Sequence, residues 1–155
     1  IGPDETIGDV YFNKLFPMGV DAMIEGLELV KAGIILKHNQ VLEDGSYESW
    51  FKKDLSAIDW SKPIDEVYNL VRATNPAPGA WTMLGENRVD IFDSRKVDAA
   101  GTPGEILDIS DDSFVVAADG GGLRISRVRV GKGKKVSGAV FVEEHGLKVG
   151  DKFSG

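Results

Sequence analysis

The sequence predicts an α+β protein in which a long helix, a connecting segment and a second helix precede a small β-barrel. Residues 4–33 and residues 61–76 carry apolar side chains at helical spacing. From residue 80 onward the pattern changes to five short β-like runs, roughly ten residues apart and separated by glycine, aspartate and asparagine. Evenly spaced short strands are typical of a small barrel.

The first helix has recognisable ends. Thr6 and Asp9 have the spacing of a capping box, and Gly33 is a suitable C-terminal stop. Pro17 should kink or divide the helix, because proline lacks the N–H that an interior position donates.

An apolar stripe follows Pro17 along one side of this helix. It consists of Val20, Met23, Ile24, Leu27 and Val30. A stripe of this size needs a sheet or another helix to cover it. We therefore expect it to pack against the barrel, to pair with a second copy of itself, or to be poorly ordered.

The connection after Gly33 shows no sustained period and contains four aromatic residues, Tyr47, Trp50, Phe51 and Trp60. Connections of this length more often join two domains than lie within one. We expect the aromatic side chains to pin this segment and place a domain boundary here.

The second helix should begin with Ser61 as its N-cap and Pro63 in its first turn. It should end at Asn75, because the residue before Pro76 disfavours the helical conformation. The later run of glycines at positions 120–122 is expected to form a hairpin turn, and a helical turn through Phe141 should close at Gly146.

Charge and composition limit the partners. The chain has 18 lysines and arginines against 25 aspartates and glutamates, and most of the excess acidity lies before residue 62. Wrapping of a polyanion by the whole chain is excluded on this balance, but a local basic patch is not. No cysteine is present, and no apolar run is long enough to cross a bilayer. We expect a cytoplasmic protein without a membrane partner.

The basic stretch "RISRVRVGKGKK" spans residues 124–135. Leu123 and Ile125 have one strand parity, whereas Val128 and Val130 have the other. A one-residue bulge near Ser126 would place all four on the core face. Six cations would then share one outer edge of the barrel: Arg124, Arg127, Arg129, Lys132, Lys134 and Lys135. Two interpretations remain open, a solvated strand face whose arginines pair with acids, and a weak contact with tRNA or another RNA.

The sequence lacks the usual catalytic and metal signatures. Neither "GGGLR" nor "GKGKK" matches a phosphate-binding loop. His38 and His145 stand alone, without the nucleophile setting of a catalytic triad or the company of other metal ligands. We therefore assign no catalytic, cofactor-binding or metal residue to this chain.

Several motifs resemble one family over essentially the whole chain. They are "LFPMG", "IDWSKP" at 58–63, Arg72, "NPAPGAWT" at 75–82 and "GLKVGDKF" at 146–153. Together they resemble the C-terminal region of the formyltransferases that use 10-formyltetrahydrofolate, a family that includes methionyl-tRNA formyltransferase and the hydrolase domain of 10-formyltetrahydrofolate dehydrogenase. "LFPMG" is closer to the dehydrogenase type.

The resemblance implies three parts. Residues 1–33 would be the last helical piece of a doubly wound catalytic domain, 34–61 an interdomain linker, and 62–155 a C-terminal barrel of the oligonucleotide-binding type. It also implies that the catalytic residues and the site for 10-formyltetrahydrofolate lie upstream of Ile1, in a catalytic domain that would be this chain's partner.

Within the barrel the resemblance assigns structural roles. Trp81, with Pro78 and Gly79, would shape the mouth of the barrel; Pro76 belongs to the same motif, and Arg72 would hold the end of the second helix. The chain would be an inactive accessory region whose parent passes a formyl group to methionyl-tRNA, water or a small amine. The alternative is a non-catalytic module that binds RNA or tRNA; Ala77 and the weak basicity of the barrel argue against tRNA.

Overall fold

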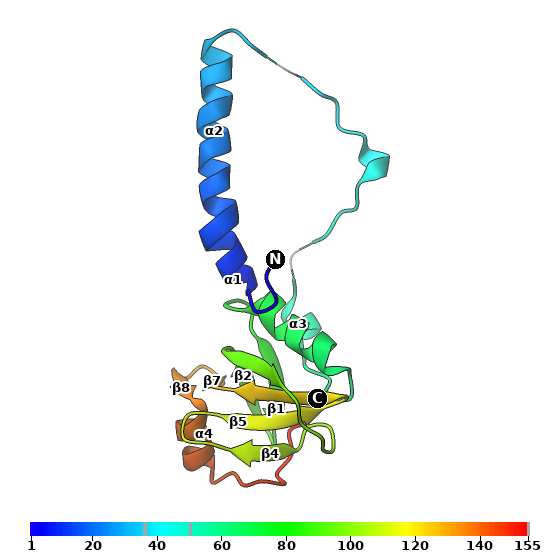
Figure 1. The fold of residues 1–155 in the computed structure, drawn as a ribbon, viewed down its shortest axis with the longest axis vertical. Coiled ribbons are helices and arrows are strands. Elements are labelled where there is room, and N and C mark those ends of the chain that lie inside the picture. The colour runs from blue at the N-terminus through cyan, green and yellow to red at the C-terminus, as the bar shows by residue number, and fades with distance from the viewer. Residues whose placement is uncertain (36, 50, 155) are drawn as a thin grey trace.

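The computed structural model describes residues 1–35, 37–49 and 51–154. It consists of a long helical arm and a compact body that contains the strands (Figure 1). The arm comprises α1 (Ile7–Val10), the π-helical turn η1 (Tyr11–Leu15) and α2 (Phe16–Lys31). The connection that follows contains two short 3-10 turns, η2 (Leu42–Asp44) and η3 (Lys53–Ser56).

The predicted ends of the first helix are confirmed. The Asp9 amide donates to the Thr6 hydroxyl oxygen at 3.2 Å, and the Thr6 amide donates to the Asp9 carboxylate at 2.9 Å. These reciprocal bonds satisfy two amides that have no partner within the helix. At the other end, Gly33 adopts a φ of +75°, the left-handed conformation that ends many helices.

The disturbance expected at Pro17 takes the form of a π-helical turn rather than a break. The turn η1 ends two residues before Pro17, and the Phe16 amide donates to the Tyr11 carbonyl, five residues back. Proline is tolerated in the first turn of a helix because its missing N–H would be unpaired there. The wide turn therefore gives Pro17 a first-turn position within an otherwise continuous helix.

The body contains eight strands in two antiparallel sheets. The first sheet has the order β1 (Ala80–Leu84), β2 (Asn87–Ile91), β7 (Arg127–Val130) and β8 (Lys135–Ser137). The second has the order β3 (Ser94–Val97), β6 (Gly121–Ile125), β5 (Phe114–Ala118) and β4 (Ile106–Ile109). Two of the five predicted runs each divide into two strands, and β8 was not predicted at all.

The chain passes from one sheet to the other at Ser126, where a bulge was predicted. Its amide donates to the Asp93 carbonyl at 2.8 Å, at the corner between β2 and β3. Leu123, Ile125 and Val128 are buried and Val130 is partly buried, so the predicted core face is confirmed. The prediction of a barrel needs correction, because the described strands pair as two separate sheets instead of closing into one.

The helix α3 (Ile64–Thr74) covers one end of the sheets. Its inward residues Val67 and Val71 are fully buried, as the spacing predicts. Ser61 does not cap this helix, which is a correction: its hydroxyl donates to Asp59 at 2.6 Å, and Pro63 occupies the N-cap position without a side-chain bond.

The C-terminal segment completes the body. The short helix α4 (Gly138–His145) ends at Gly146, whose φ of +60° confirms the predicted stop. Phe141 is fully buried and lies against Phe114 and Phe153, with ring centroids 5.6 and 6.3 Å away. Of the three glycines predicted to turn the chain, Gly120 does so, and the next two belong to β6.

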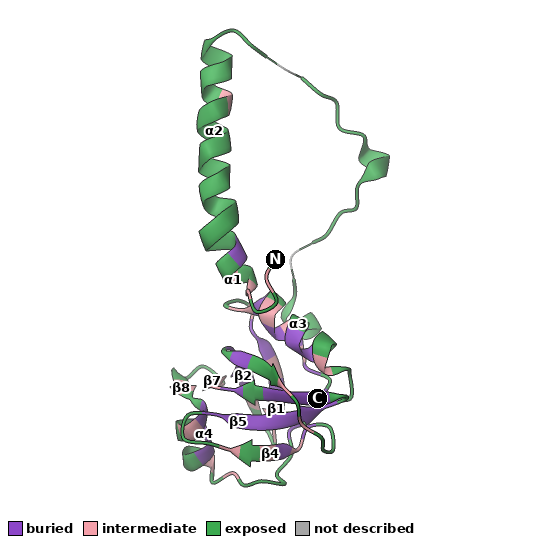
Figure 2. Cartoon of the chain, viewed as in Figure 1, coloured by how far each residue is buried: buried purple, intermediate pink, exposed green. Residues whose placement is uncertain are grey.

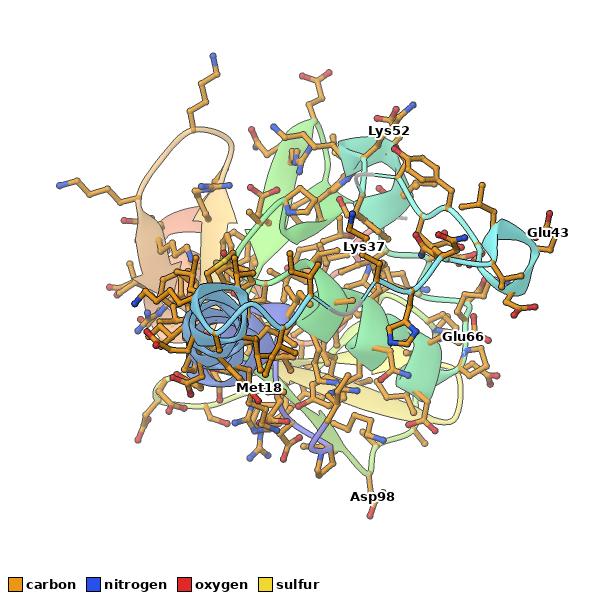
Figure 3. The ribbon with its side chains drawn as sticks, turned by 90° about the horizontal axis from the view of Figure 1, so that it is seen from above. Met18, Lys37, Glu43, Lys52, Glu66 and Asp98 are labelled. Atoms are coloured by element: carbon orange, nitrogen blue, oxygen red, sulfur yellow. The ribbon has the colours of Figure 1, made fainter. Side chains whose placement is uncertain are left out.

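The arm and the connection lie away from the sheets. Figure 2 shows that the buried residues gather in the body, whereas α2 is exposed on all sides. The expectation that its apolar stripe packs against the barrel is therefore wrong. Seen from above, Met18 of α2 lies on one side of the molecule, and the connection extends to Glu43 on the other side (Figure 3).

The predicted pinning of the connection by aromatic residues is correct only near its end. Trp60 is buried, but Tyr47 is 90% exposed and Phe51 is exposed as well; Trp50 lies outside the described residues. Over the described part of the chain, the helices are too short or too polar to cross a bilayer.

Candidate functional site

The outer face of the first sheet carries a row of four paired residues. Trp81 on β1 lies opposite Asp90 on β2, Asp90 lies opposite Arg129 on β7, and Arg129 lies opposite Lys135 on β8. Residues directly opposite one another in a sheet point to the same face and contact each other. The register therefore gathers two cations, one acid and one aromatic ring into a single line.

Asp90 is the central group of this row. Its carboxylate accepts hydrogen bonds from Arg88 Nε at 2.7 Å and from Arg129 Nε and Nη2 at 3.1 and 2.6 Å. The Asp90 side chain is only 3% exposed, whereas the two arginines are partly exposed. Buried carboxylates are stable when such charge-assisted bonds satisfy their oxygens. The two arginines are thus held in place by one acid, with one positive charge in excess.

Aromatic rings lie beside these cations. The Arg88 guanidinium stands 4.7 Å from the centroid of the Trp81 ring, and Lys135 Nζ lies 3.6 Å from that of Phe92. Such contacts between a cation and an aromatic face are attractive. This interleaving is not visible in the linear sequence, because the partners come from different strands. The signal that could have found it is strand register, which a linear sequence does not display.

The six predicted basic residues do not share one edge, which corrects the sequence-based expectation. Arg124 lies on β6 in the second sheet, opposite Arg95. Arg127 pairs with Asp93 at 3.3 Å. Lys132 and Lys134 are exposed at the turn between β7 and β8, and neither takes part in an ion pair with a described residue. The basic surface therefore consists of Arg88, Arg127, Arg129, Lys132, Lys134 and Lys135.

The other residues singled out by sequence occupy the join between α3, the sheet and the connection. Trp81 Nε1 donates to the Lys53 carbonyl at 2.8 Å and so holds η3 against the sheet. Gly79 has a φ of +87° and lies 3.5 Å, measured from an added Cβ, from the Phe92 ring. Pro76 and Pro78 both follow cis peptide bonds in the turn between α3 and β1.

Arg72 faces the start of the chain instead of holding the end of α3. Its Nη1 donates to the carbonyl oxygens of Gly2 and Glu5 at 3.1 and 2.9 Å. Beside it, the Tyr68 hydroxyl donates to Asp4 at 2.6 Å. Burial, followed by the bond to Asp4, raises the pKa of Tyr68 above its ordinary value. These bonds fasten the segment before α1 to the body.

The chain offers little for formyl chemistry. His38 lies on the exposed connection, and His145 bonds to the Phe141 carbonyl at 3.0 Å and packs on that ring. Among residues 1–35, 37–49 and 51–154, no cluster of three or more histidine, cysteine, aspartate or glutamate residues could hold a metal. General acid–base catalysis needs a titratable side chain within hydrogen-bonding reach of the reacting group. We assign no chemical step to the described residues.

Comparison with protein families identifies the chain. A family described as "Formyl transferase, C-terminal domain" matches residues 51–146. The chain belongs to this family. The match includes α3, all eight strands of the described residues and α4, and it begins just before η3.

Relatives of this formyltransferase C-terminal domain extend across the arm as well. Methionyl-tRNA formyltransferase of Magnetococcus marinus is 29% identical over 149 residues, which cover 96% of this chain and 48% of that protein. Its counterpart in Alkaliphilus metalliredigens is 35% identical over 137 residues, 87% of this chain and 43% of that protein. The chain thus spans about half the length of these curated relatives.

The chain is also similar to a dehydrogenase and to a solved structure. Cytosolic 10-formyltetrahydrofolate dehydrogenase of Xenopus tropicalis is 32% identical over 108 residues, 69% of this chain and 12% of that protein. HypX from Aquifex aeolicus, crystallised in complex with tetrahydrofolic acid, superimposes with a TM-score of 0.77 at 22% identity over 96% of this chain and 27% of that one. This likeness shows that the two share a fold.

Proposed function

We propose that this chain is the C-terminal region of an enzyme that transfers or releases a formyl group from 10-formyltetrahydrofolate, and that it serves as an accessory region without catalytic residues. The observation that carries the proposal is the extent of the relatives. They align over the arm as well as the body, yet the chain spans about half of each formyltransferase. In this proposal the two-sheet body is the C-terminal domain of that enzyme, and the protein is cytoplasmic.

The arm supplies the contact to a catalytic domain in this proposal. Exposed apolar side chains form a shallow groove along it: Tyr11, Leu15, Phe16, Val20, Met23 and Ile24. A continuous apolar surface of this kind on a protein commonly marks a contact site. A catalytic domain that covers this groove would lie alongside α2, whereas the body lies at the base of the arm (Figure 1).

The test is a chimaera in which this chain replaces the matching half of the Magnetococcus marinus methionyl-tRNA formyltransferase. Supplied with 10-formyltetrahydrofolate, the chimaera should consume it faster than the isolated catalytic half does. Formyl-methionyl-tRNA, free formate and a formylated small amine are measured as separate products, which identifies the acceptor. The proposal would be rejected if the native enzyme consumed 10-formyltetrahydrofolate faster than the isolated catalytic half, but the folded chimaera did not.

Two single substitutions on the arm test whether the apolar groove is the contact to the catalytic domain. Met23→Glu places a charge in the apolar groove, so it should separate the catalytic domain from the arm and remove the gain in rate. Glu25→Lys changes the charge of a neighbouring exposed residue outside the groove by two units, against one unit for Met23→Glu, and therefore serves as a stringent control. If neither change alters the rate, the groove is not the contact. Self-association through α2 is the competing use of the groove, and sedimentation of the chain alone detects it.

The second candidate function is a binding module for RNA or tRNA, independent of formyl chemistry. The observation in its favour is the first sheet, where cations alternate with the Trp81 and Phe92 rings and where Lys132 and Lys134 extend as exposed charges. Lysine and arginine displace counterions from phosphates. Of the two rings, that of Trp81 is partly exposed and available for stacking on a base, whereas Phe92 is buried and only supports Lys135 from below.

A further inference from the structure

The start of the chain and the first residues of α1 are joined to the body by hydrogen bonds and by close packing. Tyr68 and Arg72 bond to residues 2–5, as described above. In addition, the Gly8 amide donates to the Asn75 carbonyl at 3.0 Å. Gly8 approaches the body so closely that an added Cβ would lie 2.8 Å from Pro76 Cδ. We call these contacts between residues 2–8 and residues 68–76 the junction.

A small cavity lies within the junction. Polar residues from three elements line it, among them Asp4, Thr6, Arg72, Asn75, Ser94 and Arg95. Its volume is about 30 Å³. Ser94 is 6% exposed, and its hydroxyl has no hydrogen-bond partner among the described residues. The same holds for Arg72 Nε, which is also buried.

Two unpartnered polar atoms in the lining of one cavity need a common explanation. A buried donor without a partner costs about 1–3 kcal/mol, so native structures rarely keep one. A cavity with more than about 10–15 Å³ of space for a water-sized probe can hold a water molecule when two or more polar groups surround it. The junction cavity meets both conditions.

We propose that this cavity is a binding site for one ordered water molecule that joins Arg72 Nε to Ser94 Oγ. The water accepts a hydrogen bond from the Arg72 N–H and exchanges a second one with the Ser94 hydroxyl. Asp4 and Asp93, which also belong to the lining, supply carboxylate oxygens as further acceptors.

The charge of the lining favours water over an ion. Arg72 and Arg95 contribute two positive charges, and Asp4 and Asp93 contribute two negative ones. A site with balanced charges gives neither an anion nor a cation a net attraction. The volume leaves no room for a larger organic ligand. This lining therefore suits a single neutral molecule that can both donate and accept hydrogen bonds.

The water completes the junction. Arg72 bonds through Nη1 to the chain start and through Nη2 to Asn69, so only its Nε remains to be paired. Pairing it to Ser94 links three separate pieces of chain: residues 2–8, α3 and the first residue of β3. The position from which the arm leaves the body is then set by a hydrated polar contact.

Two measurements on the full chain test this proposal. A high-resolution crystal structure should show one water peak in the cavity, within hydrogen-bonding distance of Arg72 Nε and Ser94 Oγ. In Ser94→Val the added methyl group fills the cavity and displaces the water, which leaves Arg72 Nε unpaired. Hydrogen exchange at the Gly8 amide should then become at least about fivefold faster, the equivalent of about 1 kcal/mol.

Ser110→Val is the matched control, since Ser110 is an exposed serine at the end of β4. It should leave Gly8 exchange unchanged. An empty cavity in a well-resolved structure of the unaltered chain would overturn the proposal, even if the Ser94 variant failed to fold. Equal Gly8 exchange in the folded Ser94→Val variant and the unaltered chain would also overturn it. Neither outcome bears on formyl transfer.

Discussion

Arg129 on β7 donates two hydrogen bonds to the buried carboxylate of Asp90 on the adjacent strand β2. The two residues lie directly opposite each other in the sheet. Arg88 approaches the same carboxylate from its other oxygen. The acid therefore holds the two arginines that present the basic surface, and it is the group whose loss should disturb that surface most.

Replacing Asp90 with alanine should lower the free energy of unfolding by about 1–3 kcal/mol, because two partly exposed guanidinium groups lose their buried, charge-assisted hydrogen-bond acceptor. Urea unfolding measures this. Asp65→Ala provides the comparison: Asp65 pairs with Lys96, but its side chain is 71% exposed. Exposed pairs contribute about 1 kcal/mol or less. Equal losses in the two variants would show that Asp90 has no special role.

Binding of tRNA, if it occurs on the first sheet, should depend on salt and on the exposed lysines. Changing both Lys132 and Lys134 to alanine should reduce the slope of log affinity against log salt by about two, since each phosphate contact contributes about 0.9. Lys148→Ala with Lys152→Ala removes equal charge near the C-terminus. Absence of binding at low salt, or equal slopes in both double variants, would count against this face as an RNA contact.

The capping box predicts a pH dependence at the start of α1. The Thr6 amide, and then its hydroxyl, bond to the Asp9 carboxylate and lower the pKa of Asp9 below its usual value. Because the folded pKa is the lower one, this carboxylate stabilises the folded chain fully above its unfolded pKa, about 3.9. That contribution is lost as the pH falls through the folded value.

An NMR titration of Asp9 measures this effect. In Thr6→Val the hydroxyl donor is removed, so the pKa of Asp9 should rise toward its ordinary value while its bond to the residue 6 amide persists. Thr102→Val, a change of the same size at an exposed position far from the arm, should leave the Asp9 titration as it is. An unchanged Asp9 midpoint in Thr6→Val would contradict the capping assignment.

The aromatic core beneath α4 should be sensitive to a single truncation. Phe141→Ala should cost about 3–5 kcal/mol, because Phe141 is fully buried between Phe114 and Phe153 and its removal leaves a cavity. Val140→Ala, on the exposed side of the same helix, should cost far less. Thermal or denaturant unfolding distinguishes the two, and similar midpoints would mean that the core has collapsed around the missing ring.

Local sequence patterns predicted the helices and the core faces of the strands well. The conflict of parity between Ile125 and Val128 correctly located a break at Ser126. The parity conflict did not reveal the cause of this break, which is that the two halves of the run belong to different sheets. Which strand pairs with which depends on contacts between distant segments, and a linear pattern carries no such information.

The candidate site was harder to predict for the same reason. Arg129 was identified, but its partner Asp90 sits in an apolar run and gave no signal of a buried acid. Arg124 was grouped with the other cations because it is near them in sequence, yet it lies in the second sheet. Ser61 was chosen as an N-cap on residue type alone, while Asp59 beside it competes for the hydroxyl.

The junction changes how the polypeptide divides into units. The arm leaves the body at Gly8, beside Asn75, and the chain returns where the Ile58 amide donates to the Trp81 carbonyl at 2.7 Å. The folded body is therefore discontinuous, since residues at the very start of the chain belong with residues 56–154. Cutting the protein at residue 61 would strip Ile58 and Trp60 from the core they fill, whereas lengthening the excursion near Glu43 would leave the body intact.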